Sequence, residues 1–253
     1  MYTICFGIMV MLVFGRFLYY GKSFVGGADG LSQVAPTMQY TGQYYRALLK
    51  NILQGNLQIP MWDMSIGFGM NILQVISFDP VYILCSVLFV HDIAVGIAIF
   101  DMLCLYLAGI MFIALCYNLG CNRYAALAAA LAYIFNGYIL NYCIAQNSFL
   151  RLFIVLPMIL LGVYNVTKNR YGIFVLAVLY NITLGPLNIY TIGIVLIFCF
   201  CMAYIFSDRK KGVADFFSYI WKPVLIYILE MLVMAVFLIP TMYKVVSGGR
   251  IGN

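Results

Sequence analysis

The chain has 253 residues, of which 65% are hydrophobic and only 9% are charged. Soluble domains are about half apolar and about a quarter charged, so this composition excludes a water-soluble globular protein. The net charge of +6 comes from Lys and Arg residues spread thinly along the chain, which excludes a basic nucleic-acid-binding face. The apolar residues form long unbroken runs, so the sequence predicts an all-α, polytopic membrane protein.

Seven apolar runs are predicted to be transmembrane helices, since each approaches ~20 residues or ends in interfacial aromatic residues. They lie near residues 2–20, 93–117, 124–140, 149–165, 171–186, 188–206 and 223–243. The first is predicted to be a retained helix because it has no basic segment before it and no Ala-x-Ala site after it.

The distribution of Lys and Arg predicts the orientation of these helices. The basic loops are 118–123, 166–170 and 207–222, whereas the opposing short loops 141–148 and 185–188 contain neither residue type. The positive-inside rule places the basic loops in the cytoplasm. The N-terminus is therefore predicted to be cytoplasmic and the first large loop, residues 21–92, to be extracellular.

This outer loop is predicted to carry two helices at the membrane surface. The apolar run at 81–90 is too short to cross a bilayer. Residues 37–54 place apolar side chains on one face and Gln, Arg and Lys on the other, and Gly55 can close the helix. We expect this amphipathic helix to lie in the interface, either as a simple anchor or with a direct role in binding.

Few side chains can carry chemistry. Asp29 lies between glycines just outside the first helix, where its carboxylate can reach the membrane surface. Asp101 and Glu230 fall inside predicted spans, where a central charge costs roughly 2.5–3.5 kcal/mol, so they are functional candidates as well as possible packing residues. The eight cysteines form no Cys-x-x-Cys pair and are predicted to be small membrane hydrophobes, and His91 is the only histidine.

Short motifs in a consistent order give a further indication. The motif positions are Gly27, Asp29, Gln33, Pro36, Gly55, Pro60, Trp62, Gly67, Gly69, Asp79, Pro80, Tyr82, Leu119, Gly120, Arg123, Ala125, Ala126, Asn136, Gly137, Asn147, Phe149 and Pro157. With them the chain resembles the N-terminal part of YfhO-type bacterial membrane proteins, which are similar to the GT-C class of glycosyltransferases. We expect residues 1–253 to be a single transmembrane domain of a longer protein.

The resemblance implies a catalytic loop after the first helix, with Asp29 as general base or substrate-orienting carboxylate. It also implies a donor sugar on a polyprenyl phosphate in the membrane lipid and a cell-envelope glycopolymer acceptor such as teichoic acid. The residues expected to bind substrate are Gln33, Arg46, Trp62, Asp63, Asn147 and Arg151. The available cations for the leaving phosphate are Arg46, Lys50 and Arg151, and arginine suits bidentate phosphate contact.

No cofactor is predicted. Many GT-C enzymes pair acidic residues in the first loop, and this chain has no Asp-x-Asp there, so the sequence does not support a metal site. Two other functions stay open. A lipid or polymer transporter would line its path with intramembrane charges such as Asp101 and Glu230, and a non-catalytic membrane scaffold would keep the fold without the chemistry.

Overall fold

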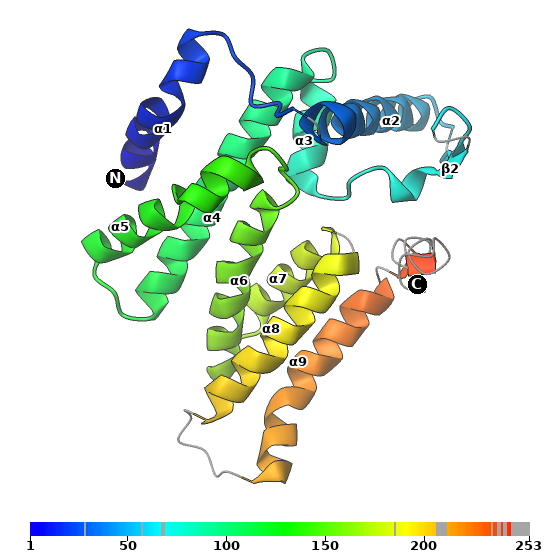
Figure 1. The fold of residues 1–253 in the computed structure, drawn as a ribbon. Coiled ribbons are helices and arrows are strands. Elements are labelled where there is room, and N and C mark those ends of the chain that lie inside the picture. The colour runs from blue at the N-terminus through cyan, green and yellow to red at the C-terminus, as the bar shows by residue number, and fades with distance from the viewer. Residues whose placement is uncertain are drawn as a thin grey trace, which may run out of the picture. The chain divides into compact units, whose positions relative to one another are not determined.

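The computed structural model consists almost entirely of helices (Figure 1). It describes residues 1–27, 29–56, 58–66, 69–184, 186–205, 212–233, 235–236, 239 and 242–243. The chain falls into two compact units, Met1–Ile154 and Val155–Asn253. The predicted all-α class is confirmed, since the sheet in the described part consists of two strands of two residues each.

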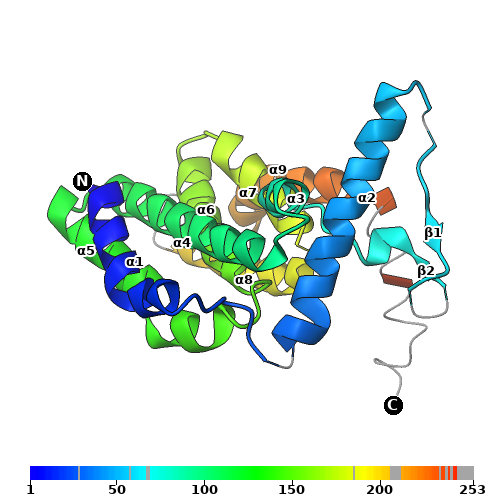
Figure 2. The same ribbon diagram turned by 90° about the horizontal axis from the view of Figure 1, so that it is seen from above.

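The first unit contains five helices of eight or more residues that lie wholly within it. They are α1 (Tyr2–Tyr19), α2 (Ala35–Leu53), α3 (Pro80–Leu88), α4 (Ile93–Asn118) and α5 (Arg123–Ile134). Its shorter elements are the π-helical turns η1 (Gly30–Val34) and η3 (Ile139–Cys143), the 3-10 turn η2 (Ile72–Gln74), and the antiparallel strands β1 (Trp62–Asp63) and β2 (Met70–Asn71). Figure 2 shows this small hairpin beside α2.

The two helices predicted in the outer loop are both present. Helix α3 begins where predicted because the carboxylate of Asp79 accepts hydrogen bonds from the backbone N–H of Val81 at 2.8 Å and of Tyr82 at 3.2 Å. Pro80 occupies the first turn, where its missing N–H costs nothing. Helix α2 ends before Gly55, whose φ of 76° is a left-handed conformation that favours glycine.

A glycine lets α2 and α3 approach closely. A Cβ at Gly42 would overlap the carbonyl oxygen of Ser86 and would lie 2.8 Å from its carbonyl carbon. Thr41, the neighbour of Gly42, is fully buried, as is Met38 one turn earlier. The N-terminal half of α2 is therefore fixed against α3. Its C-terminal half exposes apolar side chains, namely Leu49, Ile52 and Leu53.

Helix α4 forms the centre of the first unit. Its side chains Ile97, Phe100, Cys104, Leu105 and Ala108 are at most 1% exposed. Helix α1 lies against it, where the hydroxyl of Tyr2 donates to the carbonyl of Tyr106 at 3.0 Å. The contact holds the N-terminal end of α1 on α4.

The predicted third span, residues 124–140, is wrong in its length, because α5 ends at Ile134. The side chain of Asn136 donates to the carbonyl of Tyr133 at 2.7 Å and accepts from the backbone N–H of Ile139 at 3.0 Å. Asparagine side chains compete in this way with helical backbone bonds. The chain resumes as the separate turn η3.

Within the described residues, two helices are long and apolar enough to cross a membrane, α4 and α6 (Leu150–Thr167). With 26 and 18 residues they are about 39 and about 27 Å long, near the ~30 Å of a bilayer core. The total of seven spans stays a prediction. The basic residues 209–211, which helped to set the predicted orientation, lie outside the described residues.

The second unit contains the rest of α6 together with α7 (Gly172–Ile182), α8 (Pro186–Ile205) and α9 (Val213–Val233). The predicted span at 171–186 is shorter in the structure, where α7 has 11 residues. Helices α6 and α7 approach closely, because a Cβ at Gly162 would lie 2.8 Å from the Cα of Phe174. Glu230 on α9 is 7% exposed, and neither carboxylate oxygen has a hydrogen-bond partner within the described part of the chain.

Candidate functional site

Asp29 lies between α1 and α2, immediately before the turn η1. The link from α1 is held by aromatic packing, since the ring of Phe24 contacts Phe14 and Phe17 with centroids 5.0 and 5.6 Å apart. Further along the link, a Cβ at Gly26 would lie 3.3 Å from the Cβ of Ala145. The segment that carries Asp29 therefore runs directly along the chain that follows η3.

Two amide side chains bind the two carboxylate oxygens of Asp29. Gln33 donates from Nε2 to Oδ1 at 3.0 Å, and Gln146 donates from Nε2 to Oδ2. The structure thus brings together two residues predicted for the site, Asp29 and Gln33. It adds Gln146, whose signal in the sequence was a short polar stretch between apolar runs. The amides fix the orientation of the carboxylate, which is half-buried.

A second group of polar side chains lies behind this site in the same unit. Nη1 of Arg151 is 3.7 Å from Oδ2 of Asp79 and donates to the hydroxyl of Ser77 at 3.4 Å. Its guanidinium also lies 5.8 Å from the ring centroid of Tyr82. Asp79 is fully buried and the Arg151 side chain is 12% exposed. The guanidinium expected to bind a donor phosphate therefore already has an acidic partner.

Asp101 and Asn147 continue this buried group. Both carboxylate oxygens of Asp101 on α4 lack a hydrogen-bond partner within the described residues, as do Nδ2 of Asn147 and Nε of Arg151. The amide of Asn147 lies close enough to interact electrostatically with the carboxylate of Asp101, although not in hydrogen-bond geometry. The interior of the first unit thus contains buried donors and a buried acceptor without a hydrogen-bond partner within the described residues.

Arg46 is engaged elsewhere. Its guanidinium donates to the carbonyls of Val87 at 2.7 Å and Leu88 at 3.4 Å, and Nη1 lies 3.1 Å from Nε2 of His91. A cation at this position stabilises the C-terminal end of α3. Because Arg46 comes 11 residues after the start of α2, it lies about 16 Å along the helix axis from that end. Within the described residues its guanidinium binds these carbonyls and His91, and its role toward a donor phosphate stays a prediction.

Trp62 and Asp63 form part of the hairpin beside α2. Asp63 accepts from the hydroxyl of Tyr40 at 2.7 Å, and from the backbone N–H and the hydroxyl of Ser65 at 2.8 and 2.7 Å. The Ser65 bonds, and then the Tyr40 bond, hold the pKa of Asp63 below its usual value. Burial and the Asp63 carboxylate raise the pKa of Tyr40, so its hydroxyl remains a donor.

Acid is expected to release this hairpin from α2. A depressed pKa means that the Asp63 interactions stabilise the hairpin above the ordinary value of 3.8 and are lost as the pH falls through the lower folded value. Trp62 fluorescence, recorded in a Trp221→Phe background, should change with a midpoint below pH 3.8. Asp63→Asn should remove the transition, whereas a midpoint above 3.8 in the parent would contradict the described bonds.

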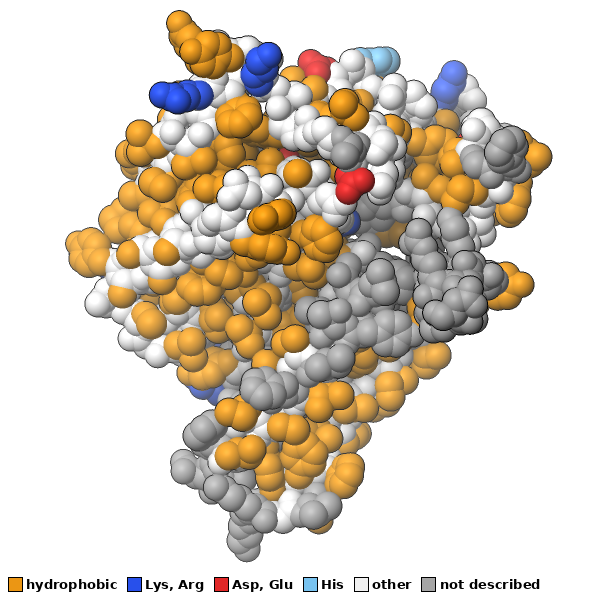
Figure 3. All heavy atoms as spheres, in the orientation of Figure 1, with side chains coloured by type: hydrophobic (Ala, Val, Ile, Leu, Met, Phe, Trp, Pro, Cys, Tyr) orange, Lys and Arg blue, Asp and Glu red, His pale blue; other side chains and the backbone are white. Residues whose placement is uncertain are grey.

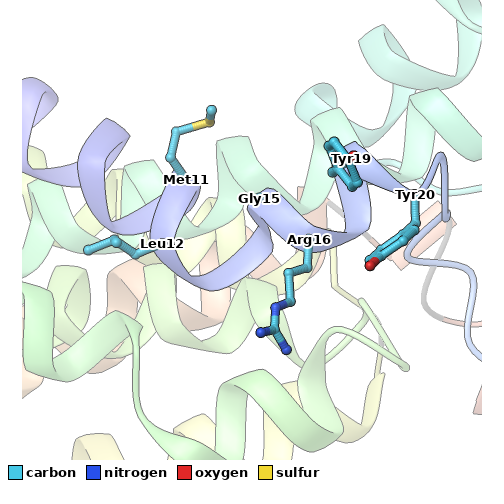
Figure 4. Close-up of a pocket in the computed structure, with 6 residues that line it drawn as sticks. All are labelled: Met11, Leu12, Gly15, Arg16, Tyr19 and Tyr20. Atoms are coloured by element: carbon cyan, nitrogen blue, oxygen red, sulfur yellow. The ribbon is translucent and has the colours of Figure 1, made fainter.

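A hollow at the end of α1 is distinct from the Asp29 site. It is lined by Met11, Leu12, Gly15, Arg16, Tyr19 and Tyr20, and Figure 4 shows the Arg16 side chain extending from the helix. The lining offers one cation and no carboxylate. It is typical of a helix end at a membrane surface, where aromatic rings and an arginine reach the headgroups.

Hydrophobic side chains cover most of the visible surface of the described residues, and charged side chains are few (Figure 3). Together with the apolar helices α4 and α6, this surface is typical of an α-helical membrane protein, here with a carboxylate held by two amides after its first helix. The family model described as bacterial membrane protein YfhO matches residues 2–252, so the chain belongs to the YfhO family. No curated protein and no solved structure matches the chain.

Proposed function

We propose that this protein is a membrane glycosyltransferase that moves a sugar from a polyprenyl-phosphate donor to a cell-envelope glycopolymer such as teichoic acid. One observation carries the proposal: the Asp29 carboxylate, just after the first helix, is held at both oxygens by amide donors. A carboxylate kept in one orientation on a membrane-surface loop suits proton transfer to or from a bound sugar hydroxyl.

In this reaction Asp29 accepts the proton of the acceptor hydroxyl while that oxygen attacks the anomeric carbon of the donor. The bond from the anomeric carbon to the phosphate oxygen breaks, and polyprenyl phosphate leaves with its negative charge. Gln33 and Gln146 carry no charge and orient the carboxylate by their hydrogen bonds. Arg151, which comes five residues after Gln146, is the proposed cation for the leaving phosphate.

The proposal includes a topology. The protein lies in the cell membrane as a multi-pass protein with a cytoplasmic N-terminus, and loop 21–92 is extracellular. Helices α2 and α3 support this arrangement, since both lie in that loop and α2 ends in exposed apolar side chains next to Lys50. Such a helix end is typical of an interfacial helix, which would keep the site at the level of the donor headgroup.

Sugar transfer in proteoliposomes tests the proposal. The full-length parent is reconstituted with a radiolabelled polyprenyl-phosphate sugar, and teichoic acid is supplied on the face that carries loop 21–92. We expect label to appear in the polymer, and not when the acceptor is confined to the opposite face. Movement of the labelled lipid across the bilayer without transfer would instead support the transporter, and neither activity would support the scaffold.

A further inference from the structure

Residues 145–151 connect the Asp29 site to the buried polar group behind it. Two backbone hydrogen bonds close this segment into a turn, from Phe149 to the carbonyl of Gln146 at 3.0 Å and from Leu150 to the carbonyl of Asn147 at 3.2 Å. We call it the 145–151 turn. Contacts at both of its ends, rather than the two bonds alone, determine where it lies.

One end of the 145–151 turn touches the segment that carries Asp29. Ala145 packs against Gly26, and the amide of Gln146 binds Oδ2 of Asp29. The contact is close because residue 26 is a glycine, and a methyl group there would be 3.3 Å from the Cβ of Ala145. The position of the turn therefore helps to set the orientation of the carboxylate.

The other end is fixed by Arg151. Its ion-pair partner Asp79 also caps α3, and α3 is held on α2 at Gly42. The Arg151 guanidinium is thus attached, through Asp79, to the closely packed helices α2 and α3. Separating a buried arginine from its carboxylate partner would leave both charges buried without compensation, which is costly. The pair therefore resists movement of the turn away from Asp79.

We propose that Arg151 is a positioning residue, which by pairing with Asp79 fixes the 145–151 turn so that the Gln146 amide meets the Asp29 carboxylate. The functional part of this inference rests on the proposed role of Asp29 as base. The placement of the turn is independent of that role.

A cysteine cross-link measures the position of the turn without any assay of activity. The pair Gly26→Cys and Ala145→Cys places two sulfurs on Cβ atoms about 3.3 Å apart, close to the ~3.5–4.5 Å of a disulfide. The full-length protein in membranes is oxidised for increasing times. Peptide mass spectrometry then separates the 26–145 link from links to the native Cys143. We expect rapid formation of the 26–145 link in the parent.

Removing the ion pair should slow this link. The single variant Arg151→Gln leaves Asp79 buried without its partner and can fail to fold, so the test uses Asp79→Asn together with Arg151→Gln. Asparagine is also a good N-cap, so α3 keeps its first turn. We expect the double variant to fold and to form the 26–145 link at least tenfold more slowly. The single variant Arg151→Lys, which retains the charge beside Asp79, should form the 26–145 link at a rate between those of the double variant and the parent.

Arg123→Gln provides the matched control, because Arg123 lies in the same unit, over the ring of Tyr124, and donates to the hydroxyl of Tyr124 at 2.7 Å. It should leave the cross-linking rate unchanged. An unchanged rate in the folded double variant would overturn the positioning role, as would a parent that forms no 26–145 link. A slower link together with a lower kcat at similar KM supports both proposals. A slower link with no sugar transfer in the parent rejects the enzyme and retains the positioning role.

Discussion

Asp29→Asn is expected to lower sugar transfer by about 10²- to 10⁴-fold, the usual contribution of a general base. The amide cannot take the proton of the acceptor hydroxyl, although it has nearly the same shape as the carboxylate. One of the two glutamine donors would also face an NH2 group in place of an oxygen, so the side chain would lose a fixed orientation. Initial rates measured with the polyprenyl-phosphate donor test this expectation.

Asp92→Asn is the matched control for this variant. Asp92 is exposed and caps α4 through a 3.4 Å bond to the backbone N–H of Val95, a role that asparagine can also perform. Both variants should insert and express like the parent. If Asp29→Asn retains parental transfer while Asp63→Asn or Asp101→Asn abolishes it, the base has been assigned to the wrong carboxylate. If none of the three affects transfer, the enzyme proposal fails.

Gly42→Ala should strongly destabilise the packing of α2 on α3. The new Cβ would overlap the Ser86 carbonyl, and a backbone atom cannot turn aside as a flexible side chain can. Alanine improves helix propensity by roughly 1 kcal/mol over glycine, but overpacking costs about 1–3 kcal/mol and more where the backbone must move. We therefore expect a lower thermal midpoint in detergent, or loss of folded protein, and separation of α2 from α3.

Gly7→Ala is the matched control, since Gly7 also lies inside a helix but has no atom within 4 Å of its Cβ position. It should leave the thermal midpoint unchanged or raise it slightly through helix propensity. Equal midpoints for the two variants would show that α2 and α3 do not pack through Gly42. The comparison separates the loss of the contact from the general effect of adding a methyl group.

Several features were accessible from the sequence because their causes are local. Long apolar runs require helices in lipid, and this decided the all-α class. Apolar residues at helical spacing over 37–54 predicted α2. Asp79-Pro80 predicted the start of α3, because an N-cap and a first-turn proline act within one turn. Asp29 and Gln33 were each predicted for the site, and the structure pairs them across one helical turn.

The tertiary structure alone decided which distant side chains complete the site. Gln146 is 117 residues from Asp29, and no periodicity or cap relates them, because their contact depends on how the chain after η3 packs on the link after α1. The same packing commits Arg46 to the carbonyl end of α3 and Arg151 to Asp79, where the sequence predicted two cations for a donor phosphate. Sequence patterns report the helices and their polar faces. The partner of each buried charge follows from helix packing, which juxtaposes residues far apart in the chain.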